Sequence, residues 1–127
     1  MKKPSLYLET SIVSYLTARP AKDLNTAAHQ QITAEWWDTK RKNFDLYISK
    51  VVMNEAASGD VEVAARRVKL LKPLRMLPIT REVAALARDF AKLGCVPPKA
   101  ADDALHIALA AVHGVHFLLT WNCTHIN

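Results

Sequence analysis

The residues best suited to chemistry in this chain are acids that lie far apart in the sequence: Glu9, Glu55, Asp102 and Asp103, with the amide of Asn122. Each lies where an apolar segment ends or in the first turns of an expected helix. Carboxylates gathered in one cleft repel one another strongly unless they are protonated or bridged by cations. Oxygen ligands of this kind suit Mg²⁺ or Mn²⁺, which can activate a bound water and stabilise charge on a phosphoryl oxygen. The pattern therefore predicts a divalent-metal site and the hydrolysis of phosphodiester bonds.

A parallel β-sheet with helices between its strands would bring these residues together. Short runs of Val, Leu, Tyr and Phe predict strands over residues 5–8, 45–48, 75–79 and 115–120. Pro78 favours an edge position for the third of them. In the stretches between strands, apolar residues return every three or four positions, which is typical of helices. Because ligands bind beyond the carboxyl ends of the strands in an open parallel sheet, we expect an α/β fold with its site there.

Hydroxyl and acidic residues mark the starts of the expected helices. Thr10 and Ser11 can cap a short helix after the first strand, and Ser49 can cap the helix after the second. Asp60 is a good cap for a further helix, and Thr80 begins the helix that follows the third strand. These residues fix where each helix is expected to begin.

Three segments carry an expectation about burial. The helix that begins near residue 24 has one apolar stripe, so these residues are expected to face inward: Leu24, Ala28, Ile32 and Trp36. The helix from about residue 100 to 112 is apolar on every side, which places it in the middle of the fold. The strand over residues 115–120 is almost continuously apolar, as strands inside a parallel sheet are.

Length and composition fit one globular domain over residues 1–127, because the chain has 127 residues, of which 50% are hydrophobic and 23% charged. The longest apolar candidate, residues 104–112, is interrupted by His106 and is too short to cross a bilayer. The first residues lack the apolar stretch of a signal peptide. We therefore expect a cytosolic protein with no membrane partner, in which Cys95 and Cys123 are reduced thiols.

The charge balance makes a polyanionic partner plausible. Lys and Arg number 17 against 12 Asp and Glu, a net charge of +5. If a cation neutralised the four acids of the cleft, 17 cations would face eight acids, a remaining surface charge of +9 that attracts a phosphate backbone. The basic residues at 40–42 and 66–75 are candidates for phosphate contacts, although such clusters are commonly just solvated faces.

Four motifs in order give the chain a resemblance to a known family. They are the segment YLETSI at residues 7–12, the helical Glu55, the segment DALHIA at residues 103–108, and LLTWN at residues 118–122. In this combination the chain resembles the PIN-domain nucleases, and among them the VapC-like toxins. The resemblance implies a three-layer α/β/α sandwich with a parallel sheet, Mg²⁺ or Mn²⁺ held by acids, and endonuclease action on RNA. It also implies a small antitoxin partner from a type II pair and, frequently, a homodimer.

The resemblance assigns roles position by position. Glu9 stands where the family usually has an aspartate, Glu55 matches its helical glutamate, and Asp103 matches the aspartate that opens the long helix. Asn122 holds the fourth acid position, and Ser11 matches a small hydroxyl residue that helps to order the site. A glutamate at position 9 reaches one methylene farther, and an amide at 122 binds a cation less tightly than an anion does. The family's usual last strand is not accounted for by the residues after 120.

Two residues near the expected site have competing interpretations. Asp102 suits a helix N-terminus through the helix dipole, so it is interpreted as a cap or an auxiliary ligand. His106 lies one turn later and could reach the cleft, but a single histidine on an apolar helix is more often a hydrogen-bonded packing residue.

Two other functions compete with the nuclease hypothesis. The departures at Glu9 and Asn122 leave room for a PIN-like module that binds RNA or a protein without cleavage. A receiver-type domain also gathers acids at strand ends, but here two acids sit at a helix start and no lysine follows the final strand.

Overall fold

The computed structural model describes residues 2–94 and 101–121 and contains one sheet of four parallel strands. The strands are β1 (Ser5–Leu8), β2 (Asp45–Ser49), β3 (Arg75–Leu77) and β4 (Phe117–Leu119), in the order β3-β2-β1-β4. The first strand of the chain therefore lies inside the sheet, and its carboxyl end is flanked by those of β2 and β4. The α/β class and the places of the four strands expected from the sequence are confirmed, but β3 ends at Leu77 rather than at residue 79, and β4 is shorter than the expected 115–120.

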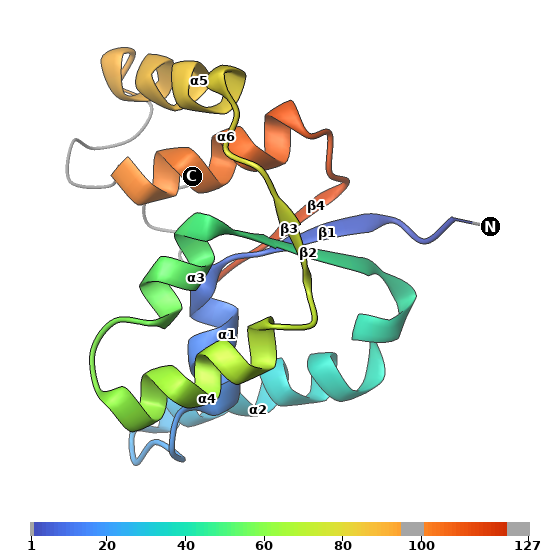
Figure 1. Ribbon diagram of the computed structural model, residues 1–127. Helices are drawn as coiled ribbons and strands as arrows, with labels where there is room; N and C mark the ends of the chain where they lie inside the picture. Colours follow the sequence, from blue (N-terminus) through green and yellow to red (C-terminus); the bar gives the residue numbers. More distant parts are fainter. Residues whose placement is uncertain (1, 95–100, 122–127) are drawn as a thin grey trace.

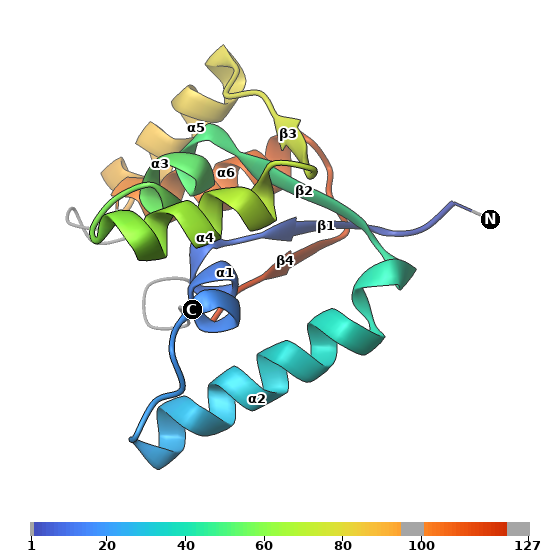
Figure 2. The ribbon, with the colours of Figure 1, turned by 60° about the horizontal axis from the view of Figure 1, so that its bottom comes forward.

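Helices cover both faces of the sheet (Figure 1). The helices on one face are α1 (Thr10–Thr17), α2 (Leu24–Thr39) and α4 (Val61–Leu71), and those on the other are α5 (Arg81–Lys92) and α6 (Ala101–Val112). The short α3 (Lys50–Ala56) follows β2 directly, and a 3-10 turn, η1 (Arg41–Asn43), precedes β2. The architecture is the expected three-layer α/β/α sandwich, and Figure 2 shows the same layers from another side.

The core forms where β1 meets helices from both layers. Tyr7 and Leu8 of β1, Ile48 of β2 and Leu109 of α6 have no exposed surface. Tyr7 pairs with Tyr47 on one side and with Leu118 on the other, which fixes the register of the sheet around β1. The end of β1 is thus held rigidly at the place where Glu9 leaves the sheet.

Three of the expected caps are confirmed, and two are wrong. The side chains of Ser49, Asp60 and Thr80 accept hydrogen bonds from backbone N–H groups in the first turns of α3, α4 and α5. At the start of α1 the N-cap residue is Glu9, which makes no side-chain cap bond. The hydroxyls of Thr10 and Ser11 donate instead to the carboxylates of Glu55 and Glu9, because charged acceptors form stronger hydrogen bonds than backbone groups do.

The apolar stripe predicted for α2 is wrong at Leu24, Ala28 and Ile32, which are exposed, and is confirmed at Trp36, which is partly buried against the core. Leu24 is 85% exposed and Ile32 is 53% exposed, whereas Thr33 is buried. The hydroxyl of Thr33 accepts a hydrogen bond from the indole N–H of Trp121 at 2.8 Å. This contact holds Thr33, rather than Ile32, against the body of the protein.

The two expectations for the end of the described chain have different outcomes. The helix α6 lies between α5 and the sheet, as expected (Figure 1). Among the described residues, however, β4 is an edge strand, and Phe117 is 52% exposed. Cys95, Cys123 and Asn122 lie outside the described residues. None of the helices in the described part of the chain combines the length and apolar character needed to span a bilayer.

Candidate metal centre

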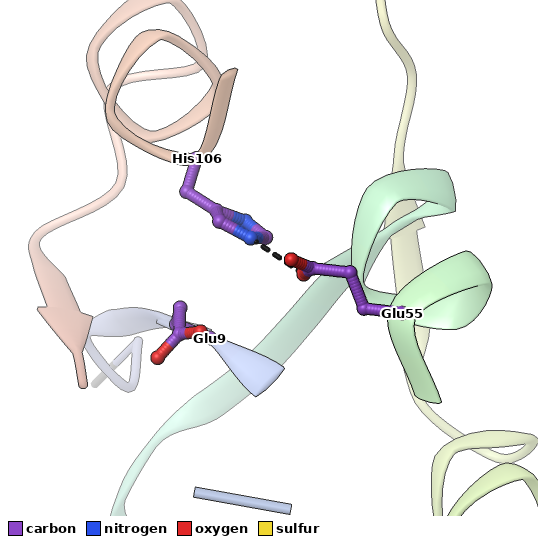
Figure 3. A group of neighbouring side chains, drawn as sticks. All are labelled: Glu9, Glu55 and His106. Atoms are coloured by element: carbon purple, nitrogen blue, oxygen red, sulfur yellow. Dashed lines mark hydrogen bonds and ion pairs between the residues drawn. The ribbon is translucent and has the colours of Figure 1, made fainter. Parts of the chain in front are cut away.

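Two of the predicted acids and one histidine meet at the carboxyl end of the sheet. Glu9 follows β1, Glu55 lies on α3 and His106 lies on α6. Figure 3 shows the two carboxyl groups and the imidazole turned toward a common space. One ligand atom from each of these residues lies within 4.8 Å of those from the other two.

Glu9 is held by its neighbours in α1 and by the end of β4. Its backbone N–H donates to the carbonyl of Leu119 at 3.1 Å, and its side chain is only 5% exposed. Its Oε1 accepts hydrogen bonds from the hydroxyls of Ser11 and Thr120, each at 2.5 Å. The Ser11 hydroxyl also accepts from the backbone N–H of Trp121 at 2.9 Å. The orientation of the Glu9 carboxylate therefore depends on the pairing of β4 with β1.

Glu55 is oriented by donors from both helical layers. Its Oε1 accepts from the hydroxyl of Thr10 at 2.5 Å and from Nε2 of His106 at 2.8 Å. Burial alone would raise the pKa of this carboxyl, but the hydrogen bonds from His106 and Thr10 outweigh it, so the pKa is lowered. Glu55 is therefore an anion at neutral pH.

A buried hydrogen-bond chain lies behind Glu55. Nδ1 of His106 lies 2.7 Å from the Tyr7 hydroxyl, which lies 2.7 Å from the Ser49 hydroxyl. His106, Tyr7 and Ser49 have no exposed surface. Because the Glu55 carboxylate can only accept, Nε2 of His106 is the donor in that hydrogen bond. Burial raises the pKa of the Tyr7 phenol, which keeps its proton on the oxygen.

The two acids of α6 occupy different environments. Asp102 is exposed, and its carboxyl lies near that of Glu55. Burial, and next the negative charge of Glu55, raise the pKa of Asp102. Asp103 is 7% exposed and opens the same helix. Among the described residues, the group within 4.8 Å consists of Glu9, Glu55 and His106, and Asp103 is not a member.

The match to a family model decides the family. A model of the PIN domain matches residues 6–122, from β1 to the end of the described chain and one residue beyond. The chain belongs to the PIN domain family.

Among the solved structures that match is one whose likeness extends across nearly the whole chain. It is a toxin of Mycobacterium tuberculosis, VapC20, described as cleaving the Sarcin-Ricin loop. The likeness covers 93% of this chain and 90% of that one, with a TM-score of 0.71 and 17% sequence identity. Comparison with curated protein sequences gave no match. At this identity the likeness shows the fold, in agreement with the resemblance drawn from the motifs.

The donors of this PIN domain fit a divalent cation. Carboxylate oxygens are the ligands that Mg²⁺ and Mn²⁺ prefer, and two of them lie in the group of three. In this arrangement the imidazole of His106 orients Glu55 and is not itself a free ligand, because Nε2 carries the proton that it donates to the carboxylate. Two anions held this close repel each other, so a cation between them would relieve that repulsion.

Sequence reasoning left His106 ambiguous and missed Thr10, Thr120 and Tyr7 as members of the centre. His106 is a buried, hydrogen-bonded packing residue, as interpreted, yet its Nε2 also reaches the carboxylate of Glu55. Its position four residues after Asp102, on the same helix face, was the available signal. Thr10, Thr120 and Tyr7 gave no such signal, because their roles depend on strand pairing.

Proposed function

We propose that this PIN domain is an endoribonuclease that depends on Mg²⁺ or Mn²⁺ and hydrolyses phosphodiester bonds of RNA. We further propose that it acts in the cytosol as the toxin of a type II toxin–antitoxin pair. Its partners would be an RNA substrate, a small antitoxin and, in a homodimer, a second copy of the chain. The description of VapC20 as a toxin that cleaves the Sarcin-Ricin loop supports the substrate class.

The observation that carries the proposal is the meeting of Glu9 and Glu55 with His106 within 4.8 Å. These residues come from three separate segments, and hydrogen bonds fix both carboxylates. An exposed acidic surface would leave its side chains mobile. A preorganised pair of carboxylates is suited to one fixed cation and to chemistry at one fixed position.

The proposed ligands are Glu9, Glu55 and Asp103, with Asn122 as the fourth. When bound, Mg²⁺ or Mn²⁺ lowers the pKa of a water and stabilises negative charge on a phosphoryl oxygen. The protein's own groups set the geometry. Ser11 keeps the carboxylate of Glu9 in one orientation, and its N–H partner Trp121 keeps Ser11 in place.

The remaining polar groups of the centre adjust charge and orientation. His106 and Thr10 fix Oε1 of Glu55. Asp102 supplies a further, exposed carboxyl near Glu55 as an auxiliary group.

Cleavage of single-stranded RNA tests the proposal. The purified protein should cut a labelled RNA with Mg²⁺ or Mn²⁺, and EDTA should stop the reaction. Glu55→Gln and Asp103→Asn should each abolish cleavage, whereas Glu62→Gln, an exposed site on α4, should leave it unchanged. Circular dichroism checks that each variant is folded. Unchanged cleavage by folded Asp103→Asn would remove this residue from the ligand set.

A binding module without cleavage is the second candidate, and one contact favours it. The hydrogen bond from His106 to Glu55 partly satisfies the carboxylate without any cation. Calorimetric titration with Mn²⁺ separates the two functions. The nuclease should show saturable binding that Glu55→Gln removes, and the binding module should show none.

A further inference from the structure

A groove of about 650 Å³ lies away from the metal centre, between the end of α2, η1, β2 and α4. We call it the basic groove, and its main lining residues are Trp37, Arg41, Leu46, Arg66, Lys69 and Leu70. The leucines and the tryptophan form apolar walls, and the three cations stand beside them. An adjoining hollow of about 230 Å³ shares Arg41 and adds Lys42. Among the described residues that line either hollow, Asp45 is the one acid.

The cations of the basic groove are not used to hold the fold together in the way that a neighbouring arginine is. Arg67, on the same helix, donates from Nε to the carbonyl of Ala56 at 2.9 Å and from Nη2 to that of Ser58 at 2.7 Å. Within the described part of the chain, by contrast, the side chains of Arg66 and Lys69 make no hydrogen bond or ion pair. Their charges are therefore available to an anion.

Arg41 adds a planar surface to the groove. Its guanidinium lies over the ring of Trp37, 4.6 Å from the ring centroid. This contact holds the guanidinium by cation–π attraction and leaves its second face free of the ring. Single-stranded nucleic acids are bound by such combinations of positive charge with aromatic and guanidinium planes, because phosphates pair with the charge and bases stack on the planes.

We propose that the basic groove binds a single-stranded segment of RNA outside the bond that is cleaved. This inference rests on the proposed function, to which it adds a second site of contact with the substrate. The apolar walls contact base faces, and Arg66 and Lys69 pair with phosphates. An acidic protein segment would use the cations but not the stacked Arg41 and Trp37, so the observations favour RNA.

The position of the groove makes it a separate site. Figure 1 shows η1 and the start of β2 at the end of the sheet away from α3. β2 runs from Asp45, at the groove, to Ser49, where α3 begins. At about 3.3 Å per residue this strand spans roughly 13 Å. One strand of RNA can therefore reach both the groove and the metal centre, and a very short RNA can occupy the metal centre alone.

Binding of labelled single-stranded RNA in EDTA, without cleavage, tests the inference. The variant is Arg66→Gln/Lys69→Gln, and the matched control is Arg88→Gln/Lys92→Gln, which removes two exposed cations from α5. Each lost phosphate contact lowers the salt dependence of single-strand binding by about 0.7 in log–log slope, so we expect a loss of about 1.4. The affinity advantage of the wild type should then fall about sevenfold between 50 and 200 mM salt. The control should keep the wild-type slope.

Arg41→Lys examines the stacked pair separately. It keeps the charge but lacks the planar guanidinium, so RNA affinity should fall while the salt slope stays close to that of the wild type. Wild-type affinity in this variant would contradict stacking at the groove.

The outcomes distinguish this inference from the proposed function. Equal losses in the groove variant and the α5 control would show a general charge effect and overturn the inference. Polyglutamate serves as a probe for an acidic protein segment. If the groove variant binds RNA as well as the wild type does but no longer binds polyglutamate, the groove is a protein-docking surface and the inference is overturned. Cleavage of a very short RNA with Mn²⁺ should persist in the groove variant. If the wild-type protein itself does not cleave RNA, the proposed function fails. If the groove variant nevertheless binds RNA more weakly than the wild type does, the assignment of the groove stands.

Discussion

The side chain of Glu9 is held through one of its two carboxylate oxygens. In the described part of the chain, its side-chain hydrogen bonds come from Ser11 and Thr120, and both end on Oε1. A carboxylate has about four lone-pair positions, so Oε2 retains its capacity to accept. The protein thus orients the group through one oxygen and leaves the other for a cation or water.

Replacing Ser11 tests this arrangement. Ser11→Ala removes a donor to Glu9 and the acceptor of the Trp121 N–H. We expect a loss of about 1 kcal/mol in the free energy of unfolding and about fivefold weaker Mn²⁺ binding, because Glu9 becomes less well oriented. Urea unfolding and calorimetry measure the two effects. Ser14→Ala, on the same helix, is the control and should change neither, since no hydrogen bond of the Ser14 hydroxyl is seen within the described residues.

Tyr7 carries the buried chain behind Glu55, and its hydroxyl can be removed alone. Tyr7→Phe leaves the Ser49 hydroxyl and Nδ1 of His106 without their partner in a place that excludes water. We expect the free energy of unfolding to fall by about 1–3 kcal/mol, measured by urea unfolding. Tyr47→Phe is the comparison, because within the described residues its hydroxyl makes one long, exposed hydrogen bond, from Arg75 at 3.3 Å. Equal losses in the two variants would contradict a special role for the Tyr7 hydroxyl.

The two glutamates of the centre could be predicted from the sequence because each follows a recognisable strand in a recognisable motif. His106 was visible but ambiguous, since a helix that is apolar all round gives a histidine no distinguishing surroundings. Thr10 and Thr120 could not be predicted, because a hydroxyl near a helix start or strand end is ordinarily a cap. Their donation to Glu55 and Glu9 is decided by which strands pair, and this is not written in local sequence.

At the scale of elements, α2 shows that the spacing of apolar residues can identify a helix without identifying its buried face. Spacing identified a helix, and the helix is present, but the face it turns inward was predicted wrongly at Leu24, Ala28 and Ile32. Apolar residues at Leu24 and Ile32 remain exposed because α2 is an outer helix fixed by the bond between Thr33 and Trp121. By contrast, β1 and β2 were predicted well, since each contains a short apolar run, residues 6–8 and 46–48, preceded by a polar residue.

The start of α2 provides a pH-dependent test. Asp23 caps this helix, and hydrogen bonds from the Thr26 backbone N–H and hydroxyl lower the pKa of its carboxyl. Its stabilising effect is thus complete above the ordinary carboxyl pKa and is lost as pH falls through the lowered value. We expect Asp23→Ala to have a lower Tm than the wild type at pH 7 and a shrinking difference in acid. Asp23→Asn, an uncharged cap, should keep most of the wild-type Tm at pH 7.

At the scale of the whole molecule, a cation that binds the folded protein but not the unfolded chain must stabilise the folded state. With Mn²⁺ at about 100 times its Kd, the gain is about 2.7 kcal/mol, or roughly 10 °C in Tm for a domain of this size. Differential scanning calorimetry with and without Mn²⁺ measures it. The double variant Glu9→Gln/Glu55→Gln should fold but show no such increase. An increase of the same size in this variant would place the ion elsewhere.

The order β3-β2-β1-β4 pairs the strand made first with the strand made last in the described chain. While the protein is being translated, Glu9 emerges early, but Thr120 and the backbone of Leu119 emerge only after more than a hundred further residues. Until then one side of β1 is unpaired and the carboxylate has no fixed direction. Until residues 119 and 120 have been made and released, a nascent chain cannot complete its acidic centre, so the proposed cleavage of RNA is delayed until nearly the whole described chain exists.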